Sequence, residues 1–424
     1  MSENAYIKHG FDLQWFLQDY WQKKPCLIRQ FSPDFIDPLD EHDLAGLAQE
    51  PEVDSRVISH QTNGSYQRVG SHQTKGSDQK TDSYEKADSN TVWELTQGPI
   101  DDFEPLCKGA WTLLVQGVER YISEVDALAE QVKHIGHWRM DDVMVSFSNT
   151  NGGVGPHLDQ YDVFIVQGKG QRRWQVGLPG TYESIQPHAL LSQITGFSPV
   201  IDEVLQSGDA IYIPPKHPHN GVALSDCLNY SIGFRAPTDV ELLHGLIDEG
   251  EAMQVSQERY ADPEIYQYRG QSTVAAEVTE HELTQLKANM IALLQSNQAE
   301  HALMRYLSRQ NLPDMRTELE NEGDHEPAYV IDSVIDYIQQ GGTFILAAGV
   351  KPIYTEQTRQ VFTFFIDGQA FETPTELRSA IEQIIHNKAE AKELINTLTE
   401  PQQQAFVGVL TDLLNQGYLE CCDI

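Results

Sequence analysis

The sequence predicts an α+β protein in which an antiparallel β-sandwich or barrel precedes a helical region and a small C-terminal domain. Three observations lead to this fold class. Between residues 138 and 235, short strand-like runs are separated by Gly- and Pro-rich turns, without helical periodicity. After Pro237, apolar residues recur at the helical intervals of three and four. Residues 326–424 combine helical segments with a hairpin pattern.

The strand-like runs justify the sandwich. The first strand is expected over residues 143–148, and the Gly-rich loop NTNGGVGP follows it. The second is expected over residues 157–166, and a GKG turn leads from it into a third over 172–176. Later strands are expected at 210–213 and 228–234. Short strands joined by such turns are typical of antiparallel sheets.

The segment after the strands is predicted to be helical. Its apolar residues form two amphipathic stripes, which contain Leu283, Leu286, Met290 and Leu293 and, further on, Leu303 and Leu307. A stripe of this kind either packs inside the chain or forms a dimer face, and both interpretations stay open. Residues 316–327, rich in Glu, Asn and Gly, are the expected linker to the last domain.

The C-terminal domain is expected to resemble a winged helix. Its predicted elements are a helix at 330–338, a hairpin within 343–371, and helices at 375–386, 391–398 and 401–415. Winged helices commonly bind DNA, but the helix at 375–386 carries one arginine, Arg378, among acidic and apolar residues. We therefore expect it to serve protein interaction or scaffolding.

The charge of the chain is strongly negative. The 29 Lys and Arg residues are outnumbered by 63 Asp and Glu residues, which gives a formal net charge of −34. Such a surface repels phosphate backbones and anionic membranes, so direct nucleic-acid binding and membrane binding are not expected. The charge either attracts a basic partner or keeps the protein soluble.

The cysteines and the N-terminal sequence indicate a reduced cytoplasmic protein. The five cysteines show no CxxC spacing, which argues against a disulfide framework and against a structural zinc site. No signal peptide is recognisable, and no run approaches 18 consecutive apolar residues.

A polar segment near the N-terminus is nearly self-similar. The sequence SHQTNGSYQ at residues 59–67 recurs as SHQTKGSDQ at 71–79. The segment has too few apolar residues to stack as structural repeats. We predict that residues 61–90 are a flexible insertion or a hairpin extended by local duplication. His60, just before this segment, and His72, within it, are expected to be solvated loop histidines rather than metal ligands.

The motif His157-Leu-Asp159 predicts a metal site. If it opens a strand, the two side chains point to the same face, since they are two residues apart. A third ligand is available in the segment YIPPKHPH, where His217 and His219 compete for the position. Two histidines and one carboxylate form the facial triad of non-haem Fe(II) oxygenases, which leaves positions open for cosubstrate and oxygen.

An oxygenase of this type usually takes electrons from 2-oxoglutarate, whose distal carboxylate needs a buried cation. Arg172 and Arg173 follow the GKG turn onto the next strand and point to opposite faces, so only one of them reaches inward. An arginine suits this role because its planar fork binds both carboxylate oxygens. A hydroxyl of Ser148 or Ser146 could complete the pocket.

Three strings resemble the bacterial ribosomal oxygenases of the JmjC type. They are GGVGPHLDQYDVF at 152–164, YIPP with the Pro-His pair ending at His219, and NYSIGFRAP at 229–237. The resemblance extends to residues 35–47 and 415–418 and covers most of the chain.

The resemblance implies three parts: a JmjC catalytic domain over residues 1–237, a helical dimerisation region over 238–325, and a winged-helix-like domain over 326–424. The catalytic domain would be a double-stranded β-helix, the jelly roll of the cupins. By motif position, the resemblance implies that His157, Asp159 and His219 bind Fe(II). It likewise implies that Ser148 and Arg172 bind 2-oxoglutarate, and it places Asn229 near the cosubstrate.

The resemblance also implies a substrate, an arginine of a large-subunit ribosomal protein, which would be hydroxylated at its third carbon. The substrate guanidinium would need a carboxylate or aromatic wall, for which the candidates are Asp141, Asp142, Asp162 and Tyr161. Two alternatives stay open: the same chemistry on another protein side chain or a small metabolite, and a non-enzymatic interaction scaffold. A basic ribosomal protein would also match the acidic charge of the chain.

Overall fold

The structure is a computed structural model, which describes residues 5–62, 91–252, 259–263, 267, 276–310, 329–356, 361–386 and 390–422. The chain divides into two compact units, residues 1–236 and 237–424. The predicted three-part division into 1–237, 238–325 and 326–424 stays a prediction. The predicted linker at 316–327 lies outside the described residues, as do His72 and all of the predicted insertion except Gln61 and Thr62.

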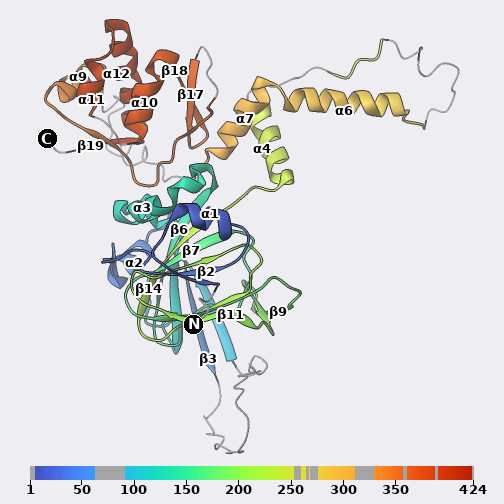
Figure 1. Ribbon diagram of the computed structural model, residues 1–424, viewed down its shortest axis with the longest axis vertical. Helices are drawn as coiled ribbons and strands as arrows, with labels where there is room; N and C mark the ends of the chain where they lie inside the picture. Colours follow the sequence, from blue (N-terminus) through green and yellow to red (C-terminus); the bar gives the residue numbers. More distant parts are fainter. Residues whose placement is uncertain are drawn as a thin grey trace, which may run out of the picture. The chain divides into compact units, whose positions relative to one another are not determined.

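The first unit contains a large sheet (Figure 1). Its nine strands follow the order β1-β2-β12-β7-β14-β6-β5-β3-β4. Neighbouring strands are antiparallel, apart from the parallel pair β1 and β2. Their bounds are β1 Ile7–His9, β2 Cys26–Arg29, β3 Ser55–Thr62, β4 Thr91–Gln97, β5 Ala110–Val115, β6 Met140–Ser148, β7 Asp162–Gln167, β12 Ala210–Ile213 and β14 Cys227–Phe234.

A smaller sheet faces the large one. It has the order β11-β8-β13, with β8 at Arg172–Gly177, β11 at Pro199–Leu205 and β13 at His219–Ala223. A separate hairpin pairs β9, Glu183–His188, with β10, Leu191–Thr195. Apolar side chains of the two facing sheets share one buried cluster, to which β7 contributes Val163 and Ile165 and β8 contributes Val176. The predicted antiparallel sandwich is confirmed.

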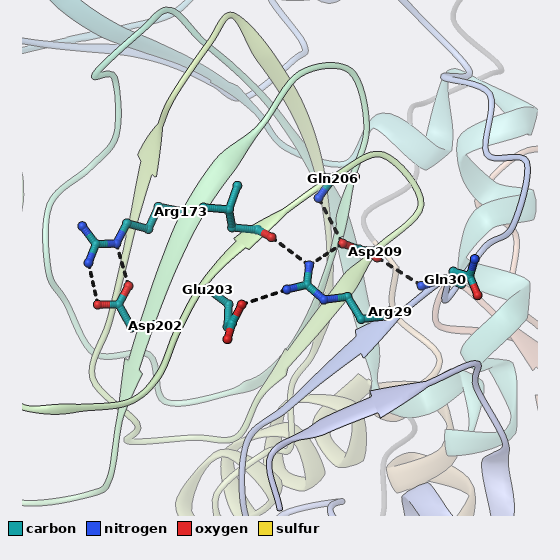
Figure 2. A network of polar contacts seen from close by, with 8 residues as sticks. Arg29, Gln30, Arg173, Asp202, Glu203, Gln206 and Asp209 are labelled. Carbon is teal, nitrogen blue, oxygen red and sulfur yellow. Dashed lines mark hydrogen bonds and ion pairs between the residues drawn. The ribbon is translucent and has the colours of Figure 1, made fainter. Parts of the chain in front are cut away.

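Ion pairs join the two sheets at one edge (Figure 2). Arg29 at the end of β2 binds the carboxylates of Glu203, at 2.9 Å, and Asp209, at 2.7 Å. It also donates to the backbone carbonyl of Val204 on β11, at 2.7 Å. Asp209 accepts from the backbone N–H of Gln30 at 3.1 Å. These contacts join the end of β2 to β11 and to the turn before β12.

The outer face of the large sheet is covered by helices. They are α1 (Leu13–Asp19), α2 (Glu41–Leu47) and α3 (Ser123–Ala129), with the short 3₁₀ turns η1 (Val118–Arg120), η2 (Glu130–Ile135) and η3 (His137–Arg139). The helices begin where the sequence supplies caps: Asp12 accepts from the backbone N–H of Trp15, and Asp40 forms a capping box with Asp43. Their apolar residues join the main core of the unit, which includes Phe16, Phe164 and Tyr212.

The second unit begins with helices α4 (Asp239–Ala252), α6 (Glu280–Leu294) and α7 (Asn297–Leu307). Glu249 on α4 is buried and binds Arg305 of α7 at 2.9 Å and also Arg309, which fastens the two helices together. The stripe predicted on 283–293 lies on α6. It stays open to solvent in the described chain, with Leu283 47% and Met290 61% exposed.

The rest of the second unit has its own apolar core. Its elements are α9 (Ile331–Gln339), β15 (Phe344–Leu346), β16 (Ile353–Tyr354), β17 (Val361–Ile366), β18 (Gln369–Pro374), η4 (Thr375–Leu377), α10 (Arg378–Ile385), α11 (Ala391–Ile395), α12 (Glu400–Asn415) and β19 (Leu419–Cys421). The hairpin consists of β17 and β18, whereas β15 pairs with the C-terminal strand β19. The predicted hairpin range of 343–371 was therefore too broad at its start. Among the described residues, no helix is long and apolar enough to cross a membrane.

Candidate metal centre

Three predicted residues come together at one end of the sandwich interior. One nitrogen each from His157 and His219 and one carboxylate oxygen of Asp159 all lie within 4.8 Å of one another. Oδ2 of Asp159 is 3.7 Å from Nε2 of His157 and 3.4 Å from Nε2 of His219. Within the part of the chain that the structure describes, this is the one group of three or more potential ligands close enough to hold a metal ion.

The backbone that positions this group differs from the prediction. The strand expected from residue 157 begins only at Asp162, so the motif lies in the loop before β7. His157 is held instead by an isolated antiparallel bridge to His219, with two N–H···O bonds of 3.0 Å each. The carbonyl of Asp159 accepts from the N–H of Lys216 at 2.8 Å. The ligands therefore converge because the loop before β7 pairs with the distant segment at the start of β13, which local strand periodicity does not reveal.

The hydrogen bonds of the two imidazoles leave the correct nitrogen free. Nδ1 of His157 lies 3.0 Å from the carbonyl of Gly155, and Nδ1 of His219 lies 3.0 Å from the carbonyl of His217. A carbonyl can only accept, so Nδ1 carries the proton in each neutral ring. The lone pair is then on Nε2, the atom that faces Asp159, as in histidines oriented for metal binding.

The charges in the group are coupled. Burial, followed by the nearby His219, lowers the pKa of His157 to about 4, so this ring is neutral near pH 7. Burial also acts to lower the pKa of His219, but the hydrogen bond to Asp159 and the charge of that carboxylate outweigh it and raise the pKa. For Asp159, burial is outweighed by its hydrogen bond and charge interaction with His219, so its pKa is lowered. In the absence of a metal ion, a proton on Nε2 of His219 makes the hydrogen bond to Asp159. A metal ion bound by this group would take the place of that proton and supply the positive charge beside the carboxylate.

His217 is not part of this group. Its ring is buried, and Nδ1 lies 3.1 Å from the carbonyl of Pro215. The structure thus brings His219, rather than His217, to the other two candidates. His188, the last residue of β9, accepts from the backbone N–H of Leu190 at 3.3 Å.

A second group lies further along the interior, on β6 and β8. Arg172 is 5% exposed and donates through Nη2 to the hydroxyl of the fully buried Ser148. The hydroxyl of Thr112 on β5 lies 2.7 Å from the same oxygen. Arg173 points the other way and forms a bidentate pair with Asp202, with both N–O distances 2.6 Å. Alternation along β8 therefore selects Arg172 as the inward residue, while Ser146 is buried on the same face of β6 as Ser148.

Arg172 lacks a counter-ion among the described residues. It forms no ion pair with a carboxylate there, and its buried Nε has no hydrogen-bond partner in the described chain. A buried guanidinium without a carboxylate is costly, so this environment fits an incoming carboxylate. Asn229, expected near the cosubstrate, lies on β14, which is next to β6 in the large sheet. Its side-chain N–H donates to Oε1 of Gln167 at 2.8 Å. Thr112 and Gln167 were missed by sequence reasoning, because nothing local distinguishes them from other strand residues.

The four candidates for the substrate wall occupy different environments. Asp162 accepts from Tyr212 at 2.5 Å and from Gln22 at 3.0 Å, and Arg139 lies at 3.3 Å, so its oxygens are engaged. Asp141 is exposed. The pKa of Asp142 is raised to about 7, chiefly by burial and then by the charges of Glu119 and Asp141.

Tyr161 is 38% exposed. Its pKa is raised by burial and then by the charges of Asp159, Asp142 and Asp141. Tyr161 therefore lies within the electrostatic reach of both the metal group and the acidic pair at the start of β6, which makes the approach to the centre acidic.

Comparison with known proteins agrees with both units. A family model of the JmjC domain matches residues 127–242, and a model of the ROXA-like winged helix matches residues 285–420. The second match begins within the region predicted as the helical dimerisation part.

Two relatives and two solved structures define the similarity. The chain is 34% identical over 415 residues to the ribosomal protein uL16 3-hydroxylase of Escherichia coli, which covers 97% of this chain and 99% of that protein. It is 35% identical over 235 residues to a probable ribosomal oxygenase of Haemophilus influenzae, covering 54% and 51%.

The solved structures are of YcfD from Escherichia coli. One has a TM-score of 0.80 at 31% identity and covers 97% of this chain and 98% of that chain. Another, in complex with cobalt and 2-oxoglutarate, has a TM-score of 0.78 at 31% identity and covers 97% and 99%. The α+β fold class, with a JmjC domain followed by a winged helix, is confirmed.

Proposed function

This chain belongs to the JmjC-type ribosomal oxygenases, and on that premise we propose that it hydroxylates an arginine of ribosomal protein uL16 with Fe(II) and 2-oxoglutarate. The observation that carries the proposal is that His157, Asp159 and His219 converge in the interior of the sandwich. Arg172 and Ser148 form a second polar group in the same interior. The non-enzymatic alternative requires a broken triad, whereas these three ligand types are present and close together.

Each group has a distinct role in this proposal. His157, Asp159 and His219 hold the metal, and the Nδ1 hydrogen bonds keep both imidazoles oriented. Ser148 and Arg172 bind the distal carboxylate of 2-oxoglutarate. This assignment is supported by the absence of a carboxylate partner for Arg172 among the described residues. When bound, Fe(II), 2-oxoglutarate and oxygen supply the oxidising chemistry that converts a C–H bond into C–OH, with succinate and carbon dioxide as by-products.

The acidic approach supports a cationic substrate side chain. The carboxyl of Asp142 lies on the same face of β6 as Ser148, because the two residues are an even number of positions apart. With Tyr161 it offers a carboxylate and an aromatic ring, two groups that suit a guanidinium. The net charge of −34 adds long-range attraction for a basic ribosomal protein and disfavours direct binding of nucleic acid. A ribosomal protein substrate also supports a cytoplasmic location, which is part of this proposal.

We also propose that the protein is a homodimer, in which α6 supplies part of the interface. Leu283, Leu286, Met290, Ile291 and Leu294 are all more than 40% exposed on this one helix. A second copy of the chain would cover such a face, since isologous contacts are the commonest oligomeric arrangement. Leu286→Glu should convert the dimer to a monomer in light scattering, whereas Lys287→Glu on the same helix should leave it dimeric.

The substrate is tested with peptides. Purified protein is incubated with Fe(II), 2-oxoglutarate and a uL16 peptide, and the peptide is examined by mass spectrometry for the gain of one oxygen on arginine. We expect the gain with the wild type and not with His157→Ala. Turnover of 2-oxoglutarate that never responds to uL16, but responds to another protein or a metabolite, would overturn the substrate. Absence of any turnover with 2-oxo acids would overturn the oxygenase function.

A further inference from the structure

A buried tryptophan lies between the two functional groups of the interior. Trp174 follows Arg172 on β8 by two residues, so their side chains lie on the same face of the strand. Cζ of Arg172 is 5.8 Å from the centroid of the Trp174 ring, and the centroid of the His219 ring is 6.2 Å from the same point. Along β8, Trp174 lies between Arg172 and Val176, the residue that pairs with His219. The indole therefore spans the space between the metal group and the guanidinium.

The indole is held in this place by its surroundings. Gly221 on β13 is directly opposite Trp174 in the β8–β13 pair, and a Cβ atom at residue 221 would lie 2.8 Å from the indole ring. The absence of a side chain at Gly221 thus allows the ring to lie flat on the neighbouring strand. Apolar residues including Val163 and Val176 belong to the same buried cluster as the ring.

The N–H of this indole has no acceptor in the described chain. Trp174 is 6% exposed, and Nε1 is among the few buried side-chain atoms without a hydrogen-bond partner there; Nε of Arg172 is another. Buried indole N–H groups normally find a partner, because leaving a donor unpaired away from water is costly. Two unpaired donors, two residues apart on one strand and pointing to one face, indicate a shared acceptor that is absent from the protein itself.

We propose that Trp174 is a binding residue for the cosubstrate, and that its Nε1–H donates a hydrogen bond to the 2-oxo acid. The inference rests on the proposed function, because that function supplies a dicarboxylate running from the metal group to Arg172. Such a molecule passes the indole and brings acceptor oxygens only. Trp174 thereby adds a neutral, directional donor to a pocket whose other contacts are a cation and hydroxyls, and the stiff ring fixes the width of the pocket.

The proposal is tested by binding, without turnover. The protein is loaded with Zn(II), which does not support oxidation, and 2-oxoglutarate is titrated calorimetrically. We expect Trp174→Phe to weaken 2-oxoglutarate binding by about tenfold or more, as for loss of a hydrogen bond to a charged group. Its affinity for Zn(II) should match that of the wild type. Trp93→Phe, in the β3–β4 hairpin, is the matched control and should bind both ligands normally.

A second measurement separates the N–H from the bulk of the ring. With ¹⁵N-labelled indoles, the resonance that Trp174→Phe removes should move downfield on addition of 2-oxoglutarate to the Zn(II) protein, and not on addition of Zn(II) alone. Replacing Trp174 by benzothienylalanine, which has sulfur in place of N–H in a ring of the same shape, should reproduce the loss of affinity.

The possible outcomes are distinct. If the wild type binds 2-oxoglutarate but the Trp174 resonance does not move and benzothienylalanine binds equally well, the indole serves packing alone and the inference is wrong, while the proposed function stands. If the Zn(II)-loaded wild type does not bind 2-oxoglutarate at all, the proposed function fails first.

Discussion

The two faces of the large sheet are built from the same strands but have opposite characters. On β6, Val143, Val145 and Phe147 point outward into the helix-covered core, while Ser146 and Ser148 point inward. On β7, the outward Phe164 packs against aromatic rings, whereas the inward Gln167 at the strand end is hydrogen-bonded to Asn229. One face is apolar and closed, and the other carries buried polar groups at its site end.

This difference shows how alternation along a strand separates stability from chemistry. The outward side chains bury apolar area and account for much of the stability of the unit. The inward polar side chains cost free energy to bury and are kept in place by hydrogen bonds to one another. Substitutions on the two faces should therefore affect different measurements, and the following predictions test this separation.

The largest effect on the free energy of unfolding is expected on the outward face of the large sheet. Phe164 is fully buried, with ring centroids of Phe16 and Tyr212 at 4.9 and 5.0 Å. Phe164→Ala should lower the free energy of unfolding by about 3–5 kcal/mol, because it leaves a cavity in a close-packed core. Urea denaturation measures this. The folded fraction should still bind 2-oxoglutarate, and Ile36→Ala, at a residue 85% exposed, should change stability little. Loss of binding without loss of stability would contradict the separation.

At the metal group we expect the opposite, a large loss of activity with little change in the free energy of unfolding. Asp159→Ala should reduce hydroxylation by more than about 100-fold, since loss of a ligand is more severe than loss of a ligand's hydrogen-bond partner, which already costs 10–100-fold. The free energy of unfolding of the metal-free protein should change by no more than about 1 kcal/mol, because the backbone bridge between His157 and His219 remains. Asp202→Ala, at the surface pair with Arg173, is the control with full activity. Retained activity in Asp159→Ala would exclude Asp159 as a ligand.

The sequence predicted the fold class and identified the residues that converge, but one of the arguments that identified them was wrong. Alternation correctly gave Arg172 and Arg173 opposite directions, since both lie within β8. The same argument applied to His157 and Asp159 failed, because those residues precede β7 and are held by pairing with the segment around His219. Such long-range pairing is invisible to local periodicity. For the same reason the sequence could not show that the donors of Arg172 and Trp174 lack partners.

An intermediate effect is expected at Asp142, an inward residue near the start of β6. Its pKa in the folded protein is raised from 3.8 to about 7, chiefly by burial and then by Glu119 and Asp141. Between these values the folded protein binds a proton that the unfolded chain has lost, so this residue makes folding less favourable as pH rises and the penalty is complete above pH 7.

Asp142→Asn should remove that pH dependence. The variant should be more stable than the wild type by about 2–4 kcal/mol at pH 8, the upper value corresponding to about three pKa units, and should lose this advantage near pH 4. Urea denaturation over this pH range measures the difference, and Asp141→Asn, at the exposed neighbour, is the control. If the difference in free energy of unfolding between wild type and variant did not vary with pH, Asp142 would be ionised over the whole pH range.

The smallest effect is expected at Arg173, the outward neighbour of Arg172. Its pair with Asp202 has good bidentate geometry, but the side chains are 44% and 32% exposed. Solvent screening limits such a pair, so Arg173→Ala should lower the free energy of unfolding by less than about 1 kcal/mol. It should leave 2-oxoglutarate affinity unchanged, whereas Arg172→Ala should weaken that affinity by at least about tenfold through loss of a charged hydrogen-bond donor. Calorimetric titration of both variants, one residue apart on β8, compares the two faces directly. Equal losses of affinity would mean that strand alternation does not determine which arginine binds the cosubstrate.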